Sequence, residues 1–159
     1  MTALFEHDFN PTTIRRVIEG RSITNVLRLA RTGVAVAECQ QKILMQGCEF
    51  DAYLFAKEVP GADIAACQAR VLNGNSPQVL RFFAQDVEGA DILALQARML
   101  EIGNALDMRI FANRVSNSDP DLLIARAAFL DGSACDRGHH SSGLQNGIAC
   151  PGNIHTTSN

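Results

Sequence analysis

One short string returns along the chain at a fixed period of 28, and this spacing constrains the fold more than any other feature of the sequence. Its four copies are Gln40-Gln41-Lys42, Gln68-Ala69-Arg70, Gln96-Ala97-Arg98 and Ile124-Ala125-Arg126. A fixed period of this length is typical of repeat proteins, in which each unit buries its apolar face only by stacking on its neighbours. We therefore predict a solenoid.

Turn residues recur with the same period as the string. The aligned positions are Gly33, Gly61, Gly89 and Asn117, followed two positions later in the last three units by Asp63, Asp91 and Asp119. Glycine and asparagine are the residues that most readily take the left-handed conformation after a helix. An Asp before an apolar residue or a proline is typical of a helix N-cap. The pattern predicts that a helix ends near each glycine and that the next begins at each Asp.

Each unit has the pattern of two short helices. The run 64–72 places apolar side chains at i, i+3, i+7 and i+8, which is one stripe of an α-helix. Residues 73–75 end this helix, and Ser76 with Pro77 starts a second one, whose apolar stripe covers 79–87. The unit is therefore predicted to be a helical hairpin.

These patterns together predict an all-α chain, built as an α-solenoid of about four helix-turn-helix repeats with a flexible C-terminal tail. The predicted parts are a polar leader at 1–11, a degenerate unit at 12–39, regular units at 40–67, 68–95 and 96–123, a half unit at 124–130 and a disordered tail at 131–159. Arg16 and Arg31 occupy apolar columns of the first unit, as expected of a capping unit whose outer face meets water.

The stretch from Ala66 to Ile92 contains Gly74-Asn75 and Gly89-Ala90-Asp91-Ile92, and it resembles the second half of an ankyrin repeat. The segment from Ala94 to Val115 is similar. The period of 28 is shorter than that of an ankyrin repeat, and the Thr-Pro-Leu-His turn is missing. Asn117-Ser118-Asp119-Pro120-Asp121 looks instead like a turn of HEAT-type or leucine-rich-variant repeats. Both resemblances imply stacked helices that bind a partner, usually a protein.

Composition and charge argue against several functional classes. The 159 residues carry a net charge of −3, without the basic excess expected of a nucleic-acid-binding protein. No apolar run approaches the length of a membrane span, and Met1 to Asn10 lacks the pattern of a signal peptide. We expect a soluble, cytoplasmic protein, with export by a signal-independent route left open.

Two columns of the string have different predicted roles. Gln40, Gln68 and Gln96 lie close to the apolar stripe, so their amides are expected to bond a carbonyl of a neighbouring turn. The basic column consists of Lys42, Arg70, Arg98 and Arg126, and it is expected to form a ridge along the stack. The ridge is either a solvated surface, with Arg70 and Arg98 paired to Asp63 and Asp91, or a site for an acidic partner or a phosphate-bearing ligand. Arg81 and Arg109 form a second candidate row.

Catalysis is not expected, because no phosphate-binding loop, zinc-protease motif or nucleophile elbow occurs in the chain. The four histidines lie in the leader and the tail, at positions 7, 139, 140 and 155. The tail carries residues of the right type for zinc, namely Cys135, His139, Cys150 and His155, but their spacing matches no familiar finger. We expect no cofactor. Cys39 and Cys67 share one column and are predicted to be core thiols.

The sequence therefore predicts a non-catalytic scaffold that binds another macromolecule through the repeat surface. The expected partner is a protein, and the basic ridge favours an acidic one. The alternatives are a zinc-binding tail and self-association through the C-terminal repeat. Self-association is considered because the last unit is incomplete, leaving Phe129 and Leu130 without a helix to cover them.

Overall fold

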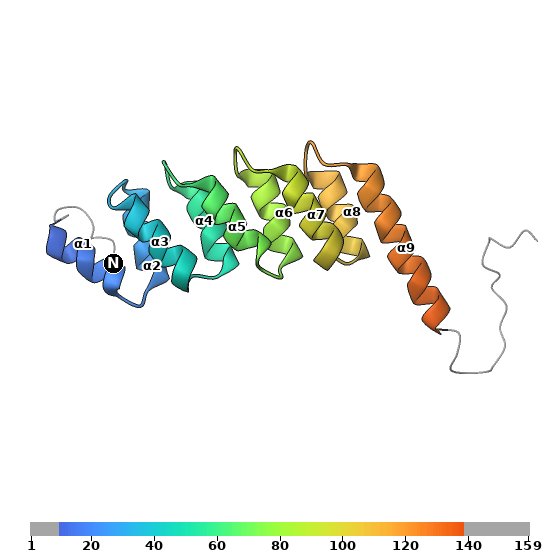
Figure 1. Ribbon diagram of the computed structural model, residues 1–159, viewed down its shortest axis with the longest axis horizontal. Coiled ribbons are helices and arrows are strands. Elements are labelled where there is room, and N and C mark those ends of the chain that lie inside the picture. The colour runs from blue at the N-terminus through green and yellow to red at the C-terminus, as the bar shows by residue number, and fades with distance from the viewer. Residues whose placement is uncertain (1–9, 139–159) are drawn as a thin grey trace, which may run out of the picture.

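The computed structural model describes residues 10–138, with side chains as far as residue 132, and this part of the chain consists of helices and turns without a strand. Its helices are α1 (Pro11–Glu19), α2 (Ile23–Arg31), α3 (Val36–Gln46), α4 (Glu49–Glu58), α5 (Ile64–Leu72), α6 (Pro77–Asp86), α7 (Ile92–Ile102), α8 (Ala105–Arg114) and α9 (Pro120–Gly138). The helices follow one another along the long axis of the molecule, with α1 at one end and α9 at the other (Figure 1). The all-α prediction is confirmed for these residues.

Neighbouring helices pack in two rows. Each helix contacts the next one along the chain, and the even-numbered helices α2, α4, α6 and α8 also contact one another in sequence. The odd-numbered helices α1, α3, α5 and α7 do the same. Helices of about ten residues are too short to be stable alone in water, so their order depends on these contacts.

The core runs along the molecule between the two rows. Phe55, Phe83 and Phe111 occupy the same column of successive units, and each of the three side chains is fully buried. Cys39 and Cys67 are also fully buried, as their column predicted, and burial raises the pKa of each thiol to about 11. Burial of these apolar columns removes a large area from water, which is the main driving force for folding.

The turns before α3, α5 and α7 have the conformation that their glycines predicted. Gly33, Gly61 and Gly89 have φ values of 79°, 78° and 80°, and Asn117 has 63°. A Cβ built on any of these glycines would meet no atom within 4 Å, so a side chain would fit. Glycine is favoured at these positions because the backbone takes a positive φ.

The predicted caps and amide bonds are also present. The carboxylates of Asp63 and Asp91 accept hydrogen bonds from the backbone N–H groups of Ala66 and Ala94 at 3.0 and 3.1 Å. The Gln40 side chain donates to the Asp63 carbonyl at 3.0 Å and accepts from the Asp63 N–H at 2.9 Å. Gln68 makes the same two bonds with Asp91, and Gln96 accepts from the N–H of Asp119. Each of these glutamines therefore joins its helix to the start of the next odd-numbered helix.

Element boundaries differ from the predicted units in two respects. The limits at 39/40, 67/68 and 95/96 fall inside α3, α5 and α7, because a period sets the length of a unit but not its starting point. The last described helix, α9, continues to Gly138, past the predicted limit at 130. A sequence without an apolar stripe can still continue a helix that has already started, because propagation is easier than nucleation. Residues 1–9 and 139–159 lie outside the described part of the chain.

Candidate functional site

The arginines of the predicted ridge bond to the backbone of the preceding turn. Arg70 donates from Nη2 to the Gly47 carbonyl at 3.0 Å, and Arg98 donates from Nη2 to the Gly74 carbonyl at 3.1 Å. These carbonyls lie just after α3 and α5, where backbone carbonyls lack helical partners and attract cations. The expected pairing with Asp63 and Asp91 is wrong, because those two carboxylates cap their own helices instead.

The other two members of the ridge differ from this pair. Lys42 is half-buried, whereas Arg126 is exposed and its guanidinium lies 5.4 Å from the centre of the Phe129 ring. The Nε atoms of Arg70 and Arg98 are buried and have no hydrogen-bond partner in the described part of the chain. Arg70 and Arg98 thus hold adjacent hairpins together, and the column does not present four equivalent cations.

A second surface lies on α4, α6 and α8 and gathers aromatic, aliphatic and cationic side chains. We call it the aromatic face. It consists of Phe50, Tyr53, Leu54 and Lys57 on α4, Gln78, Arg81, Phe82 and Gln85 on α6, and Leu106, Arg109, Ile110 and Asn113 on α8. These positions follow i, i+3, i+4 and i+7 on each helix and recur in the same columns of each unit, so they form one continuous side of the row. Phe50 and Leu106 are 42% and 63% exposed on it.

Three aromatic rings meet at the α4 end of this face. The ring of Tyr53 lies 5.5 Å from that of Phe50 and 5.8 Å from that of Phe82, measured between centroids. The Arg81 guanidinium lies 4.5 Å from the centre of the Phe82 ring and donates to the Gln85 amide oxygen at 2.7 Å. Separations of this size are favourable for aromatic pairs and for cation–π contacts. The positive charge of Arg81 is therefore held next to the apolar ring of Phe82.

A polar edge of the same cluster ties α4 to α6. The Tyr53 hydroxyl donates to Asp86 Oδ2 at 2.5 Å, and Lys57 Nζ donates to the same oxygen at 2.7 Å. Hydrogen bonds from Lys57 and Tyr53 hold the pKa of Asp86 below its ordinary value. The bond to Asp86 in turn raises the pKa of Lys57, and burial raises the pKa of Tyr53. All three groups therefore keep their ordinary charge states near neutral pH.

We expect Asp86→Asn to be destabilising at pH 7 and less destabilising as the pH is lowered toward 2. Because the pKa of Asp86 is lower in the folded chain, its stabilising effect is present above its unfolded pKa of about 4 and is lost as the pH falls through the folded pKa. Thermal unfolding of both proteins, followed by circular dichroism from pH 7 to pH 2, measures the gap in Tm. A gap that stays constant with pH would contradict this role for the carboxylate.

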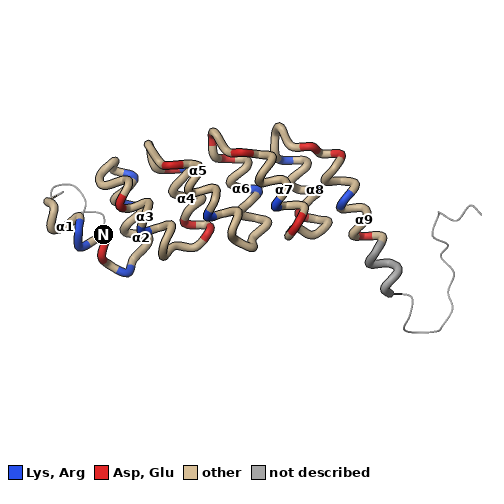
Figure 2. Tube along the Cα trace, viewed as in Figure 1, with Lys and Arg blue, Asp and Glu red and all other residues tan. Residues whose placement is uncertain are grey.

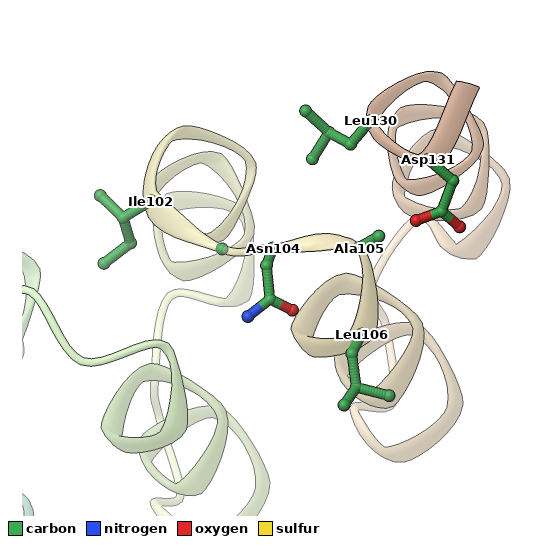
Figure 3. Close-up of a pocket in the computed structure, with 7 residues that line it drawn as sticks. Ile102, Asn104, Ala105, Leu106, Leu130 and Asp131 are labelled. Atoms are coloured by element: carbon green, nitrogen blue, oxygen red, sulfur yellow. The ribbon is translucent and has the colours of Figure 1, made fainter. Parts of the chain in front are cut away.

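A shallow cavity of about 520 Å³ opens at the other end of the row, between the turn from α7 to α8 and the middle of α9 (Figure 3). Its lining includes Ile102, Asn104, Leu106, Leu130 and Asp131. Asp131 pairs with Arg109 at 2.5 Å, which links α9 to the aromatic face. Leu130, predicted to be left uncovered, is half-buried and packs on the core.

Acidic residues lie along the edge formed by the turns that precede α5, α7 and α9 (Figure 2). Asp63, Asp91 and Asp119 lie on this edge and are exposed. No group of three or more potential ligands for a metal ion occurs among residues with described side chains. The zinc candidates Cys135, His139, Cys150 and His155 lie outside those residues. Within the described helices, none is both long enough and apolar enough to cross a bilayer.

Comparisons with models of protein families, with curated proteins and with solved structures find no match to this chain. The assignment of a site therefore depends on geometry alone. Sequence reasoning selected Arg81 and Arg109 of the aromatic face but missed Tyr53, Lys57 and Asp86. The one signal available was that Tyr53 is the sole tyrosine of the chain and lies in the same repeat column as these two arginines.

Proposed function

We propose that the chain is a short α-solenoid that acts as a non-catalytic scaffold and binds a protein through the aromatic face. The solenoid is supported by the two rows of helices and by the amide bonds of Gln40, Gln68 and Gln96, which recur with the period of the string. The resemblance to ankyrin or HEAT-type repeats remains a prediction.

The observation that carries the proposal is the composition of the aromatic face. Phe50 and Leu106 are exposed, Phe82 is half-buried, and Arg81 lies over the Phe82 ring. Tyrosine, tryptophan and arginine are the residues that contribute most to binding energy at protein interfaces. Of these, the face presents Arg81 and Arg109, while Tyr53 is buried beneath it and supports the rings of Phe50 and Phe82. Rings already packed against one another lose little conformational entropy when a partner binds.

The charges of this face favour an acidic partner. Arg81 donates to the neutral Gln85 amide and forms no ion pair among the described residues, so it can still bind a carboxylate. Arg109 and Lys57 are paired with Asp131 and Asp86 and contribute less net charge. The net charge of −3 and the carboxylates along the turn edge disfavour nucleic acid. A protein with carboxylates flanking an apolar patch fits this surface.

The test is capture of a partner from native lysate by the full chain, followed by measurement of the affinity with the purified partner. The double variant Arg81→Glu with Phe82→Ala is expected to bind at least tenfold more weakly, because it removes an anchor and reverses the charge. Arg15→Glu, on the exposed surface of α1, is the matched control for charge reversal. Helix content measured by circular dichroism must be equal in all three proteins.

Two further variants distinguish this site from the alternatives. Lys42→Glu with Arg126→Glu changes the two ridge positions outside the pair that bonds to the turn carbonyls, and it should leave the affinity within twofold. Replacement of Cys135, His139, Cys150 and His155 by serine or alanine tests the tail. The proposal would be overturned if the Lys42/Arg126 variant or the tail variant lost binding while the Arg81/Phe82 variant still bound the partner.

A further inference from the structure

The odd-numbered helices carry a solvent-facing surface without charged residues, which we call the uncharged face. Its positions follow i, i+4 and i+7 on each helix and recur in the same columns of successive units, so they form one continuous surface. It consists of Ala65, Ala69 and Leu72 on α5 and Leu93, Ala97 and Leu100 on α7. The equivalent positions 37, 41 and 44 of α3 extend it and add no charge. Leu93 is 70% exposed, and the alanines of the face are exposed as well.

A cavity of about 270 Å³ opens on this face between α5 and α7. Its apolar lining comes from Ile64, Ala65, Ala69 and Leu72 on α5 and from Ala94 on α7. The polar part of the lining is Gln68, whose amide is bonded to the backbone of Asp91, and Asp91 itself at the start of α7. The cavity therefore offers room for an apolar side chain of a partner beside a carboxylate.

One edge of the uncharged face is acidic. The turns before α3, α5, α7 and α9, with the first turns of these helices, contain acidic residues and no lysine or arginine across 33–41, 61–69, 89–97 and 117–125. In Asp63, Asp91 and Asp119, Oδ1 accepts the hydrogen bond that caps the helix. Oδ2 of each has no hydrogen bond or ion pair within the described residues. One oxygen of each carboxylate is therefore available to a cation.

The three carboxylates are placed at the spacing of the helix row. Buried glutamines bond to the N–H groups of Asp63, Asp91 and Asp119 in the same way, so adjacent caps are one step of the row apart. Packed helices lie about 8–10 Å apart. An α-helix rises about 10.5 Å in seven residues, which is close to two turns, so side chains seven apart lie on one side. An extended chain covers the same distance in about three residues, and side chains three apart point to opposite faces. The spacing therefore suits a helix better than a strand.

We propose that the uncharged face binds an amphipathic helix of another protein that carries lysine or arginine at every seventh position. The partner helix runs along the long axis of the molecule (Figure 1), with its basic residues beside Asp63, Asp91 and Asp119. Its apolar stripe lies over Ala69 and Ala97, whose small side chains allow close approach, and one apolar side chain enters the cavity. Opposite charges along the edge fix the register of the partner. The inference does not rest on the aromatic face, which lies on the other row of helices and favours an acidic partner.

Fluorescence anisotropy with the full chain and designed peptides tests the binding. The probe is an amphipathic peptide of about 21 residues with a leucine stripe and lysines at i, i+7 and i+14. One control peptide has glutamates in place of the lysines. The other has the same composition with its lysines at i, i+5 and i+10, which point to different sides of a helix. We expect the probe to bind roughly tenfold more tightly than either control, because only its lysines match the carboxylates in charge and spacing.

A variant at the centre of the face locates the contact. Ala69→Lys with Ala97→Lys adds bulk and positive charge under the probe and is expected to weaken its binding roughly tenfold. Gln78→Lys with Asn113→Lys is the matched control, because both residues are exposed on the other row and the net charge changes equally. The control should leave the affinity within about twofold. Helix content measured by circular dichroism must be equal in these proteins.

A second variant tests the carboxylates separately from the fold. Asp63→Asn with Asp91→Asn removes both charges and keeps a side-chain oxygen for each cap, since asparagine is also a good N-cap residue. We expect binding of the probe to weaken roughly threefold, as for the loss of exposed ion pairs. Asp107→Asn, which changes a carboxylate in the first turn of α8, is the control and should have no effect.

Three results would overturn the inference. The first is no binding of the probe at concentrations up to about 1 mM. The second is equal binding of the probe and either control peptide, which would mean that the charge or the spacing of the lysines is not recognised. The third is unchanged affinity of the Ala69 and Ala97 variant, which would place the contact elsewhere. None of these results bears on the aromatic face, since its partner is measured separately with the Arg81 and Phe82 variant.

Discussion

Phe83→Ala is expected to lower the free energy of unfolding by about 3–5 kcal/mol, the range measured when a fully buried phenylalanine is truncated. Phe83 is fully buried at the centre of the row, between Phe55 and Phe111 of the adjacent units. Short helices cannot rearrange to fill the cavity without losing contacts to both neighbours. Urea unfolding followed by circular dichroism measures the change.

Phe129→Ala is the matched control for this truncation, because Phe129 is exposed on α9. Its cost should stay within about 0.5 kcal/mol, as for most surface substitutions. A loss below about 1 kcal/mol for Phe83→Ala would mean that the phenylalanine column does not form the core. Because units at the centre contact neighbours on both sides, Phe83 should also be more sensitive than Phe111.

Gln68→Leu is expected to lower the free energy of unfolding by about 2 kcal/mol, since two hydrogen bonds are removed at about 1 kcal/mol each. The change keeps the approximate size of the side chain but leaves the N–H and the carbonyl of Asp91 without the Gln68 amide. These bonds join α5 to the start of α7, so their loss weakens the coupling between adjacent units. We expect a broader urea transition with a smaller m value as well as a lower midpoint.

Gln41→Leu is the control for this substitution, because Gln41 is exposed and lies outside the buried glutamine column. It should change the free energy of unfolding by less than about 0.5 kcal/mol. Equal effects of the two leucine variants would show that the amide bonds do not stabilise the array.

The turns could be predicted because their chemistry is local. A left-handed residue is most often glycine or asparagine, and an N-cap must accept a hydrogen bond, so Gly61 and Asp63 are recognisable in the sequence. Ala35 shows the limit of this reasoning. It takes a left-handed conformation with φ of 49° before α3, and nothing in its side chain indicates this. Its neighbours impose the conformation.

The candidate site was harder to predict because its residues do not repeat. Other residue types stand at the equivalent positions of the other units, so a search for repeated residues does not select Tyr53, Phe82 or Asp86. The contact of Tyr53 with Asp86 depends on how far α6 is shifted along α4, which no pattern within one helix specifies. The expected partners of Arg70 and Arg98 were wrong for the same reason, since the choice between a carboxylate and a carbonyl depends on which atom the side chain reaches.

The helical hairpins, the conformation of their turns and the column of buried glutamines could all be derived from the order of residues, because these features follow from properties of single residues and from a fixed period. Packing between helices decided which side chains share the aromatic face, which arginines bond to the backbone and which side of α9 is left uncovered. These features depend on the distances and angles between packed helices. Side chains on different helices interact only over a few ångströms, so small shifts in packing determine which of them meet.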